Sequence, residues 1–447
     1  MSVFIWKFNQ KRSIFVRNAK YDEAPERYCQ PGSLRCLCST YCRRSGRSQG
    51  FPVRFSIFHC QSIAYIIADS PLGLSFFYYI LMTTGTPIIS LRDGILECLS
   101  FADVHVHFRE PGFTQKETIL TGSRAAARGG YTIVCPMPNL NPVPDSMEHL
   151  EAELEAIRKD AVIKVLPYGS ITKGRKGFEI VDFAALRNYC VAFSDDGSGV
   201  QDGGIMREAM QEAKLQDVIL AAHCEDNSLP GTDPASEWRQ IARDLELCAQ
   251  TGCHYHVCHI SSRESARIIR QAKSGGVNVT CETAPHYLTL CREDITEDSG
   301  RFKMNPPLRE AADREALIEA LQDGTIDVIA TDHAPHTARE KSLGFAGSAM
   351  GIVGLETSFP VLYTRLVRSG RISLERLLEA MCSAPRRIFR MPWNDWDTVT
   401  VGLEEEFTID SGRFASMGKS TPFEGWRVYG KVLRTTMGNK TDFEENL

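Results

Sequence analysis

The stretch Phe101-Ala-Asp-Val-His105-Val-His107-Phe-Arg-Glu-Pro-Gly112 places two histidines at the end of a short apolar run. Successive side chains of a β-strand point to opposite faces, so His105 and His107 lie on the same side of the chain. Two imidazoles at this spacing can ligate one divalent cation. Such a pair also arises by chance in many chains of this length, so the interpretation depends on ligands elsewhere in the sequence.

The composition is that of an ordinary globular protein. Of the 447 residues, 43% are hydrophobic and 24% are charged, and the formal net charge is −5. A chain of this size can bury a large core, which suits one large α/β domain with an appendage. The charge gives no basic surface that would indicate binding to nucleic acid or to an anionic membrane. The 15 cysteines are dispersed along the chain, which favours reduced thiols and a cytoplasmic protein.

The first 99 residues differ in character from the rest. Four of their cysteines crowd together at Cys29, Cys36, Cys38 and Cys42. That spacing matches no standard zinc finger. The apolar run at 72–82 is too short to span a bilayer, and the start of the chain lacks the pattern of a secretory signal. We leave residues 1–99 unassigned, and expect a poorly ordered segment, an unrelated leader or the product of a frame error.

From residue 101 onward, short apolar runs alternate with helical patterns, as βα units do. The clearest helix is predicted at 145–159, where Ser146 can cap the first turn. The predicted strands are 132–135, 163–166, 191–193, 218–222, 255–258, 277–281 and 328–330. Nearly all of them end in a polar or metal-binding residue, which is typical of the carboxyl ends of strands in a (β/α)8 barrel. We predict such a barrel over residues 100–395 and a β appendage over 396–447.

Ten of the eleven histidines follow residue 100, and several come directly after predicted strands. The strand-end histidines are His105, His107, His223, His259, His333 and His336. Asp332 precedes one of them, and Asp196 follows the run at 191–193, where its carboxylate could bridge two ions. Imidazole and carboxylate groups are the ligands that divalent metals take. A single histidine is more often structural, but six at successive strand ends favour a metal site.

Other polar residues lie close to these positions in the sequence. Strand alternation places His254 and His256 on the opposite face from His259, so we expect a surface or helix-facing pair. Glu282 and His286 suit either a role behind the metal ligands or a purely structural one.

Seven short motifs follow one another along the chain. They are Asp103-Val-His-Val-His-Phe-Arg-Glu-Pro-Gly112, Met137-Pro-Asn139, Ser194-Asp-Asp-Gly197, Ala222-His-Cys-Glu225, Val257-Cys-His259, Met304-Asn-Pro-Pro-Leu-Arg309 and Ala330-Thr-Asp-His-Ala-Pro-His336. In this order they resemble the dihydroorotase family, bacterial type I, within the amidohydrolase superfamily. The resemblance covers about residues 101–437. It implies a TIM barrel with a small β-sandwich appendage, whose C-terminal part is present and whose N-terminal part we expect to be missing or replaced.

The resemblance also implies a ligand set for two zinc ions. His105, His107 and Asp332 would hold one ion, and His223 and His259 the second. Asp196 would bridge them, in place of the carboxylated lysine that many superfamily members use; no lysine lies near residues 191–196.

The same resemblance implies a substrate pocket. Arg109, Asn139 and Asn305 would bind the carboxylate and ring of the substrate. The residues that would complete the pocket are His107, His336 and the backbone around Met350 and Gly351. Two other interpretations stay open: Arg109 could form a surface salt bridge, and Asn139 could serve only its proline-rich turn.

The activity implied is the reversible cyclisation of N-carbamoyl-L-aspartate to (S)-dihydroorotate in pyrimidine biosynthesis. Two adjacent divalent ions would supply the nucleophile and polarise the carbonyl, and Asp332 would be the catalytic residue that shuttles the proton. The planar guanidinium of Arg109 would select an acidic ring over a neutral one.

Two alternatives to this function are considered. A hydantoinase or allantoinase is disfavoured by Arg109, Asn139 and the absent lysine. An inactive homologue that acts as a structural partner of aspartate carbamoyltransferase is also possible, because the loop at 227–237 is shorter than expected and could open the site or weaken folding. A homodimer is a further expectation.

Overall fold

The computed structural model describes residues 39–40, 54–60, 63–69, 75–80, 87–392, 394 and 396–445. The chain divides into two units, residues 1–84 and residues 85–447. In the first unit, four antiparallel strands form one sheet in the order β1 (Ser39–Thr40), β2 (Arg54–Cys60), β3 (Ile63–Asp69) and β4 (Ser75–Ile80). The four cysteines Cys29, Cys36, Cys38 and Cys42, whose spacing matches no standard zinc finger, all lie outside the described residues.

A closed ring of parallel strands forms the centre of the second unit. Its strands are β7 (Phe101–Val106), β8 (Tyr131–Pro136), β9 (Lys164–Val165), β10 (Ile219–Ala222), β11 (His254–Val257), β12 (Val279–Thr283) and β13 (Val328–Ile329). Phe193 fills the gap after β9, since it forms parallel bridges to Gly169 and Leu220. A parallel bridge between Val106 and His333 closes the ring. The predicted (β/α)8 barrel is therefore confirmed.

Mostly small and apolar side chains fill a second core, separate from the larger cluster that packs the rest of the unit. This core includes Ala102, Val104, Ile133, Cys135, Ala192, Ile219, Ala221, Cys258, Val328, Ala330, Phe389 and Met391. Its members come in alternation from successive barrel strands, as expected for side chains that point into a barrel. The barrel is thus packed along its axis, and polar chemistry is left to its ends.

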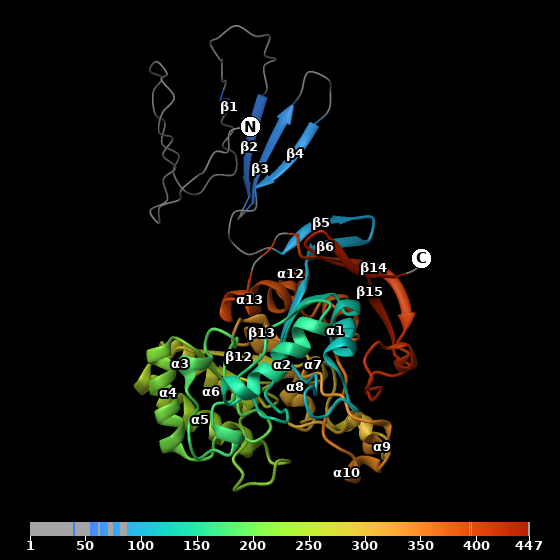
Figure 1. Ribbon diagram of the computed structural model, residues 1–447. Helices are drawn as coiled ribbons and strands as arrows, with labels where there is room; N and C mark the ends of the chain where they lie inside the picture. The colour runs from blue at the N-terminus through green and yellow to red at the C-terminus, as the bar shows by residue number, and fades with distance from the viewer. Residues whose placement is uncertain are drawn as a thin grey trace, which may run out of the picture. The chain divides into compact units, whose positions relative to one another are not determined.

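Helices connect the barrel strands and cover the outside of the ring (Figure 1). The longer ones are α1 (Ile119–Arg128), α2 (Met147–Asp160), α4 (Gly203–Gln216), α5 (Pro234–Thr251), α6 (Arg263–Ser274) and α8 (Ala311–Gln322). The side chain of Ser146 accepts a hydrogen bond from the His149 amide at the start of α2, so the predicted helix and its cap are confirmed.

Shorter helices occupy the loops and the end of the barrel. They are α3 (Phe183–Leu186), α7 (Pro285–Thr289), α9 (Ala338–Lys341), α10 (Gly344–Gly347), α11 (Ser358–Leu362), α12 (Leu374–Leu378) and α13 (Ala384–Ile388). Among the helices in the described part of the chain, none combines the length and the apolar character that a membrane crossing needs.

An antiparallel sheet forms the appendage. Its five strands lie in the order β16 (Lys440–Glu444), β15 (Arg427–Met437), β14 (Thr398–Thr408), β6 (Ile95–Leu99) and β5 (Ile88–Arg92). The long strand β14 pairs with β15 on one side and with β6 on the other. Segments from both sides of the barrel sequence therefore complete one sheet.

The pairing of β5 and β6 corrects the expectation that the N-terminal part of the appendage is missing. The two strands are joined by Asp93 and Gly94, whose φ angles are +51° and +76°. An Asp-Gly pair with positive φ at both residues is the usual turn of a tight β-hairpin. Residues 88–99 therefore belong with the appendage, although they fall in the segment that we left unassigned.

Candidate metal centre and substrate pocket

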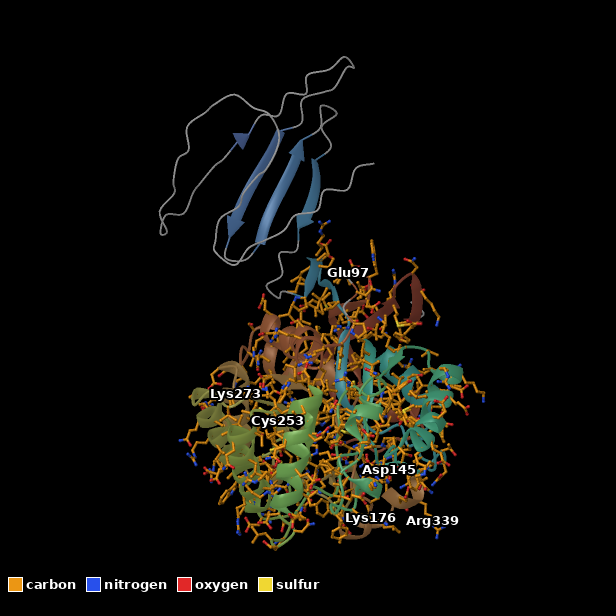
Figure 2. The ribbon with its side chains drawn as sticks, turned by 60° about the vertical axis from the view of Figure 1, so that its left-hand side comes forward. Glu97, Asp145, Lys176, Cys253, Lys273 and Arg339 are labelled. Atoms are coloured by element: carbon orange, nitrogen blue, oxygen red, sulfur yellow. The ribbon has the colours of Figure 1, made fainter. Side chains whose placement is uncertain are left out.

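The predicted metal ligands all lie at or just beyond the carboxyl ends of barrel strands. They are His105, His107, Asp196, His223, His259 and Asp332, and none is more than 7% exposed. Figure 2 shows Lys176 and Arg339, from segments that follow β9 and β13, at the end of the barrel opposite to Glu97 of β6. The ligands therefore lie at the end where barrel enzymes build their sites.

Backbone geometry turns two of these ligands inward after their strands have ended. His259 and Asp332 have φ angles of +31° and +49°, which non-glycine residues seldom adopt. The buried carboxylate of Asp103 accepts hydrogen bonds from the amides of His105 (3.0 Å) and Thr331 (3.1 Å). It thereby fixes the ends of β7 and β13 beside each other. Surrounding hydrogen bonds of this kind are what maintain strained conformations at functional sites.

Asp196 lies at the centre of the cluster. Its Oδ1 is 3.4 Å from His105 Nε2, 3.5 Å from His259 Nε2 and 3.9 Å from His223 Nδ1. Its other oxygen, Oδ2, is 3.7 Å from His107 Nε2. One carboxylate thus faces imidazoles from both predicted ion sites, which is the position that a bridging ligand requires.

The remaining ligands complete two groups around this carboxylate. His107 Nε2 is 3.0 Å from Asp332 Oδ1, and His223 Nδ1 is 3.1 Å from His259 Nε2. Ligand atoms of His105, His107 and Asp332 lie within 4.8 Å of one another, and so do those of His105, Asp196 and His259. The structure therefore brings all six predicted ligands together.

Two buried atoms at the centre have no hydrogen-bond partner among the described residues, namely His105 Nε2 and Asp196 Oδ1. An unpartnered buried polar atom is costly, and a cation between these atoms would satisfy both. Nitrogen and carboxylate oxygen donors at such strand ends suit a divalent transition metal such as zinc. The residues present therefore fit a pair of metal ions.

The two carboxylates of the cluster are ionised near neutral pH. Burial alone would raise the pKa of Asp196, but the adjacent His105 and His259 bring it well below its ordinary value. For Asp332, burial is likewise outweighed, chiefly by the hydrogen bond from His107, and its pKa lies below the ordinary range. Both groups are thus charged and ready to bind cations.

Arg109 comes two residues after His107, just beyond β7, and is partly buried. Its Nε donates a hydrogen bond to the Pro335 carbonyl at 3.4 Å, and no carboxylate of the described residues lies within salt-bridge distance. Burial lowers the pKa of Arg109 to about 10, so the guanidinium remains charged at neutral pH. The alternative of a surface salt bridge is not what the described residues show, and the cation is left without an anionic partner.

Asn139 contacts two of the predicted metal ligands directly. Its Nδ2 donates hydrogen bonds to the backbone oxygen and to Oδ2 of Asp196, both at 3.0 Å, and its Oδ1 lies 2.9 Å from His107 Nδ1. A role confined to its own turn is therefore excluded.

Asn305 reaches the other side of the cluster through an acidic residue. Its Nδ2 donates a hydrogen bond to Glu225 Oε2 at 2.9 Å, and the same oxygen lies 3.0 Å from His223 Nε2. The carboxylate of Glu225 therefore leaves Nδ1 of His223 to face the cluster.

His336, Met350 and Gly351 form a neighbouring group. His336 Nε2 donates a hydrogen bond to the Met350 carbonyl at 2.8 Å. Gly351 has a φ of +134°, and a Cβ there would lie 2.7 Å from the Ala334 carbonyl oxygen, so only glycine fits. Met350 is 54% exposed, and its carbonyl group is the part that contacts His336.

His333, one of the strand-end histidines, and Asp195, the neighbour of Asp196, bind other parts of the chain. His333 Nδ1 accepts a hydrogen bond from the Gly354 amide at 3.2 Å, while Nε2 lies 3.4 Å from Glu117 Oε2. Asp195 accepts hydrogen bonds from the amides of Ile171 and Thr172. His333 and Asp195 therefore hold loops in place.

The expectation of a surface or helix-facing pair is wrong for His256. This residue is fully buried, its Nε2 is 3.2 Å from Glu282 Oε2, and its ring packs against Phe389. Glu282 in turn lies 2.7 Å from His105 Nδ1, so it stands directly behind a predicted ligand. His259 lies beyond the end of β11 with a φ of +31°, so strand alternation does not determine how these two histidines lie relative to each other, and both contact Glu282.

Sequence reasoning missed a role for two further residues. One is Glu225, whose position two residues after His223 could have indicated a carboxylate partner for that histidine. Arg175 donates hydrogen bonds to the backbone oxygen of Asp196 and to Ser198 Oγ, the latter at 3.1 Å. No pattern in the sequence would have singled out Arg175.

The loop at 227–237, which we expected to open the site or weaken folding, has several hydrogen bonds that hold it in place. Its ends meet where the Asp226 amide donates a hydrogen bond to the Ser236 carbonyl at 2.7 Å. Arg309 Nη1 donates to the Thr232 carbonyl at 2.9 Å. The loop therefore has contacts of its own that fix it.

Comparisons with known proteins give consistent results. A family model described as Dihydro-orotase-like matches residues 95–235. A dihydroorotase of Macrococcus caseolyticus is 48% identical over 386 residues, covering 81% of this chain and 90% of the relative. A dihydroorotase of Listeria monocytogenes is 50% identical over 366 residues, covering 76% and 86% respectively. These relatives share most of their length with this chain.

Solved structures show the same fold at lower identity. An L-hydantoinase (dihydropyrimidinase) from Arthrobacter aurescens has a TM-score of 0.71 and 24% identity, covering 85% of this chain and 92% of that one. An inactive dihydroorotase-like domain of a CAD-like multifunctional protein from Chaetomium thermophilum has a TM-score of 0.61 and 17% identity, covering 79% and 97%. These likenesses support the barrel architecture alone.

Proposed function

Because this chain belongs to the dihydroorotase family, we propose that it holds two zinc ions in the cluster around Asp196 and there interconverts N-carbamoyl-L-aspartate and (S)-dihydroorotate. The chain is a hydrolase of cyclic amides that acts in pyrimidine biosynthesis, as its relatives named dihydroorotase indicate. The identity and number of the metal ions and the roles of individual residues are the proposed part.

One observation carries the metal proposal. Asp196 Oδ1 is buried, lacks a hydrogen-bond partner among the described residues and lies within 3.9 Å of imidazole nitrogens from His105, His223 and His259. His105, His107 and Asp332 would hold one ion and His223 and His259 the other, with Asp196 shared between them. When bound, the ions supply an activated nucleophile near neutral pH and polarise the ring carbonyl.

Asp332 is proposed as the catalytic residue. In the hydrolytic direction, water adds across the ring amide, the C–N bond breaks, and the water's proton must reach the departing nitrogen. Asp332 is ionised and lies 3.0 Å from His107, at the edge of the cluster, so it can accept that proton and deliver it to the nitrogen. In the biosynthetic direction the same carboxylate accepts a proton from the attacking carbamoyl nitrogen and gives it to the departing hydroxyl group, which leaves as water.

Arg109 is proposed to select the substrate. A partly buried guanidinium with no salt-bridge partner among the described residues is available to an anionic ligand, and its planar fork matches a carboxylate with two hydrogen bonds. Hydantoin and allantoin carry no carboxylate, so this residue favours dihydroorotate over them.

The rest of the proposed pocket orients the ring. Asn139 and Asn305 border the cluster from two sides, through their bonds to Asp196 and Glu225. The other proposed contributors are His107, His336 and the backbone at Met350 and Gly351.

Further proposals concern the cellular setting. The substrate is a small molecule, and we propose a cytoplasmic enzyme that forms a homodimer or associates with aspartate carbamoyltransferase. Size-exclusion chromatography with light scattering, with and without that partner, distinguishes a monomer from either assembly.

Turnover by the purified full-length protein tests the proposed function. Dihydroorotate hydrolysis and carbamoyl aspartate cyclisation are followed by the ultraviolet absorbance of the ring, beside hydantoin and allantoin at equal concentration. We expect activity on the dihydroorotate pair alone, and its loss after treatment with a zinc chelator. Comparable turnover of hydantoin would contradict the assigned substrate, and binding of two zinc ions without any turnover would favour an inactive homologue.

A further inference from the structure

Glu282 lies behind the predicted metal ligands, and each of its carboxylate oxygens has a hydrogen-bond partner. It is 1% exposed, near the end of β12. Oε1 lies 2.7 Å from His105 Nδ1, and Oε2 lies 3.2 Å from His256 Nε2. Oε1 is also 3.4 Å from the backbone nitrogen of His259. One buried carboxylate therefore touches a predicted ligand of each ion, through a side chain in one case and through the backbone in the other.

The contact with His105 determines which ring nitrogen faces the ions. A carboxylate is only an acceptor, so Nδ1 of His105 carries the proton and donates it to Glu282. The lone pair is then on Nε2, which lies 3.4 Å from Asp196 Oδ1 and 3.6 Å from Asp332 Oδ1. A neutral imidazole with this tautomer and orientation is what a metal ligand requires.

His256 holds the second oxygen of Glu282 in place. Nδ1 of His256 lies 2.8 Å from Thr280 Oγ1, and Thr280 precedes Glu282 by two residues on the same strand. The ring packs edge-on against Phe389, with 4.9 Å between the ring centroids. The hydrogen bond from His256 thus fixes the side chain of Glu282, which is almost completely shielded from solvent.

The second ion has a separate support. His223 is oriented by Glu225 through Nε2, at 3.0 Å, and faces the cluster with Nδ1. In His105 the roles of the two ring nitrogens are reversed: Nδ1 contacts the glutamate and Nε2 faces the cluster. The two glutamates therefore act on different histidines, and a change at Glu282 should affect mainly the ion that His105 binds.

We propose that Glu282, backed by His256, is the positioning residue that determines how tightly the ion of the His105, His107 and Asp332 group is held. This inference rests on the proposed two-ion function. Glu282 is not one of the proposed ion ligands or substrate contacts, and its hydrogen bond to His105 is the route by which it would act on the ion.

The variant Glu282→Gln tests the proposal, because it preserves size and an acceptor oxygen but removes the charge. Glu153→Gln is the matched control: Glu153 on α2 is 1% exposed and neither of its oxygens has a hydrogen-bond partner among the described residues. The full-length proteins are freed of metal and titrated with zinc in competition with a chromophoric chelator. Melting temperatures of the metal-free proteins measure any general loss of structure.

We expect the wild-type chain and Glu153→Gln to hold two zinc ions with similar affinities. Glu282→Gln should hold one ion as tightly as the wild type and the other roughly 10- to 100-fold more weakly, as found for outer partners of metal-bound histidines. Its turnover at limiting zinc should fall and recover when zinc is added in excess. His256→Asn, which leaves the contact between Glu282 and His105 but removes its support, should weaken the same ion to a smaller extent.

Unchanged affinity for both ions in Glu282→Gln would overturn the proposal. Equal weakening in Glu282→Gln and Glu153→Gln, with parallel losses of melting temperature, would also overturn it, because the effect would then be a general one. If Glu282→Gln does not fold, His256→Asn decides the question by the same titration. A wild-type chain that holds fewer than two ions would instead refute the proposed function, before any variant is compared.

Discussion

Replacing Arg109 with methionine should abolish most of the preference for a ring that carries a carboxylate. Methionine retains much of the apolar bulk of the side chain but loses the guanidinium. In the structure this cation has one hydrogen bond, to the Pro335 carbonyl, and no carboxylate within reach among the described residues. The substitution therefore breaks no salt bridge among the described residues, and its main effect should fall on the binding of the ligand.

The size of the effect follows from the bonds that a guanidinium makes to a carboxylate. Each hydrogen bond to a charged group contributes about 1.5–3 kcal/mol, so a two-bond contact contributes about 3–6 kcal/mol. That loss corresponds to a fall of roughly 10²- to 10⁴-fold in kcat/KM for dihydroorotate. Dihydrouracil is the same ring without the carboxylate, and its kcat/KM should change little.

Steady-state hydrolysis of both rings by the wild type and Arg109→Met measures this difference directly. Arg158→Met is the control, since Arg158 lies on α2 and its side chain is 58% exposed. Equal losses on the two substrates would refute the reasoning, because they would show that Arg109 supports the site rather than the carboxylate. A loss below tenfold on dihydroorotate would refute it as well.

Three further predictions concern residues around the site. Asp103→Ala leaves the amides of His105 and Thr331 without a hydrogen-bond acceptor. It should therefore lower the free energy of unfolding, measured by urea titration, by about 2–6 kcal/mol, and Asp103→Asn should lower it by less. A loss under about 1 kcal/mol for the alanine variant would contradict this prediction. Burial raises the pKa of Glu356 from 4.5 to about 7, so the folded state retains a proton that the unfolded chain releases, and stability should fall as the pH rises between these values. The melting temperature of Glu356→Gln relative to wild type should therefore rise from pH 5 to pH 8, whereas a constant difference would show that this carboxyl group does not titrate there. Lys341 donates hydrogen bonds to three backbone carbonyls, one of them that of Gly351 at 2.6 Å. Lys341→Met should therefore raise KM severalfold with little change in kcat. An unchanged KM would show that this lysine does not support the substrate pocket.

The strand-end positions of the site could be predicted from the sequence because two simple rules determine them. Apolar runs that end in histidine or aspartate predict a barrel with polar residues at one rim, and the six predicted ligands do converge there. The carboxyl ends of parallel strands meet at one edge of a sheet, so residues that follow these strands come together whatever their side-chain conformations.

The surroundings of the ligands could not be predicted in this way. Alternation along β11 cannot show that His256 meets Glu282 from the next strand. Such contacts depend on register between strands that are distant in sequence. Likewise, His259 lies beyond the end of its strand with a φ of +31°, where a period of two no longer applies.

The N-terminal strands of the appendage were missed for a different reason. Each of β5 and β6 has only five residues, and the expectation was built on likeness to a family pattern around residues 97–100. The Asp93-Gly94 turn was a local signal independent of that pattern. Its positive φ angles show that hairpin chemistry, and not family likeness, was the better guide there.

The central claim is that two metal ions share Asp196 and that both are needed for reaction. Zinc titration of the metal-free, full-length protein, with dihydroorotate hydrolysis measured at each step, tests this claim most directly. The structure predicts activity that reaches its maximum at two equivalents of zinc per chain. A maximum at one equivalent, or two tightly bound equivalents with no hydrolysis, would contradict it.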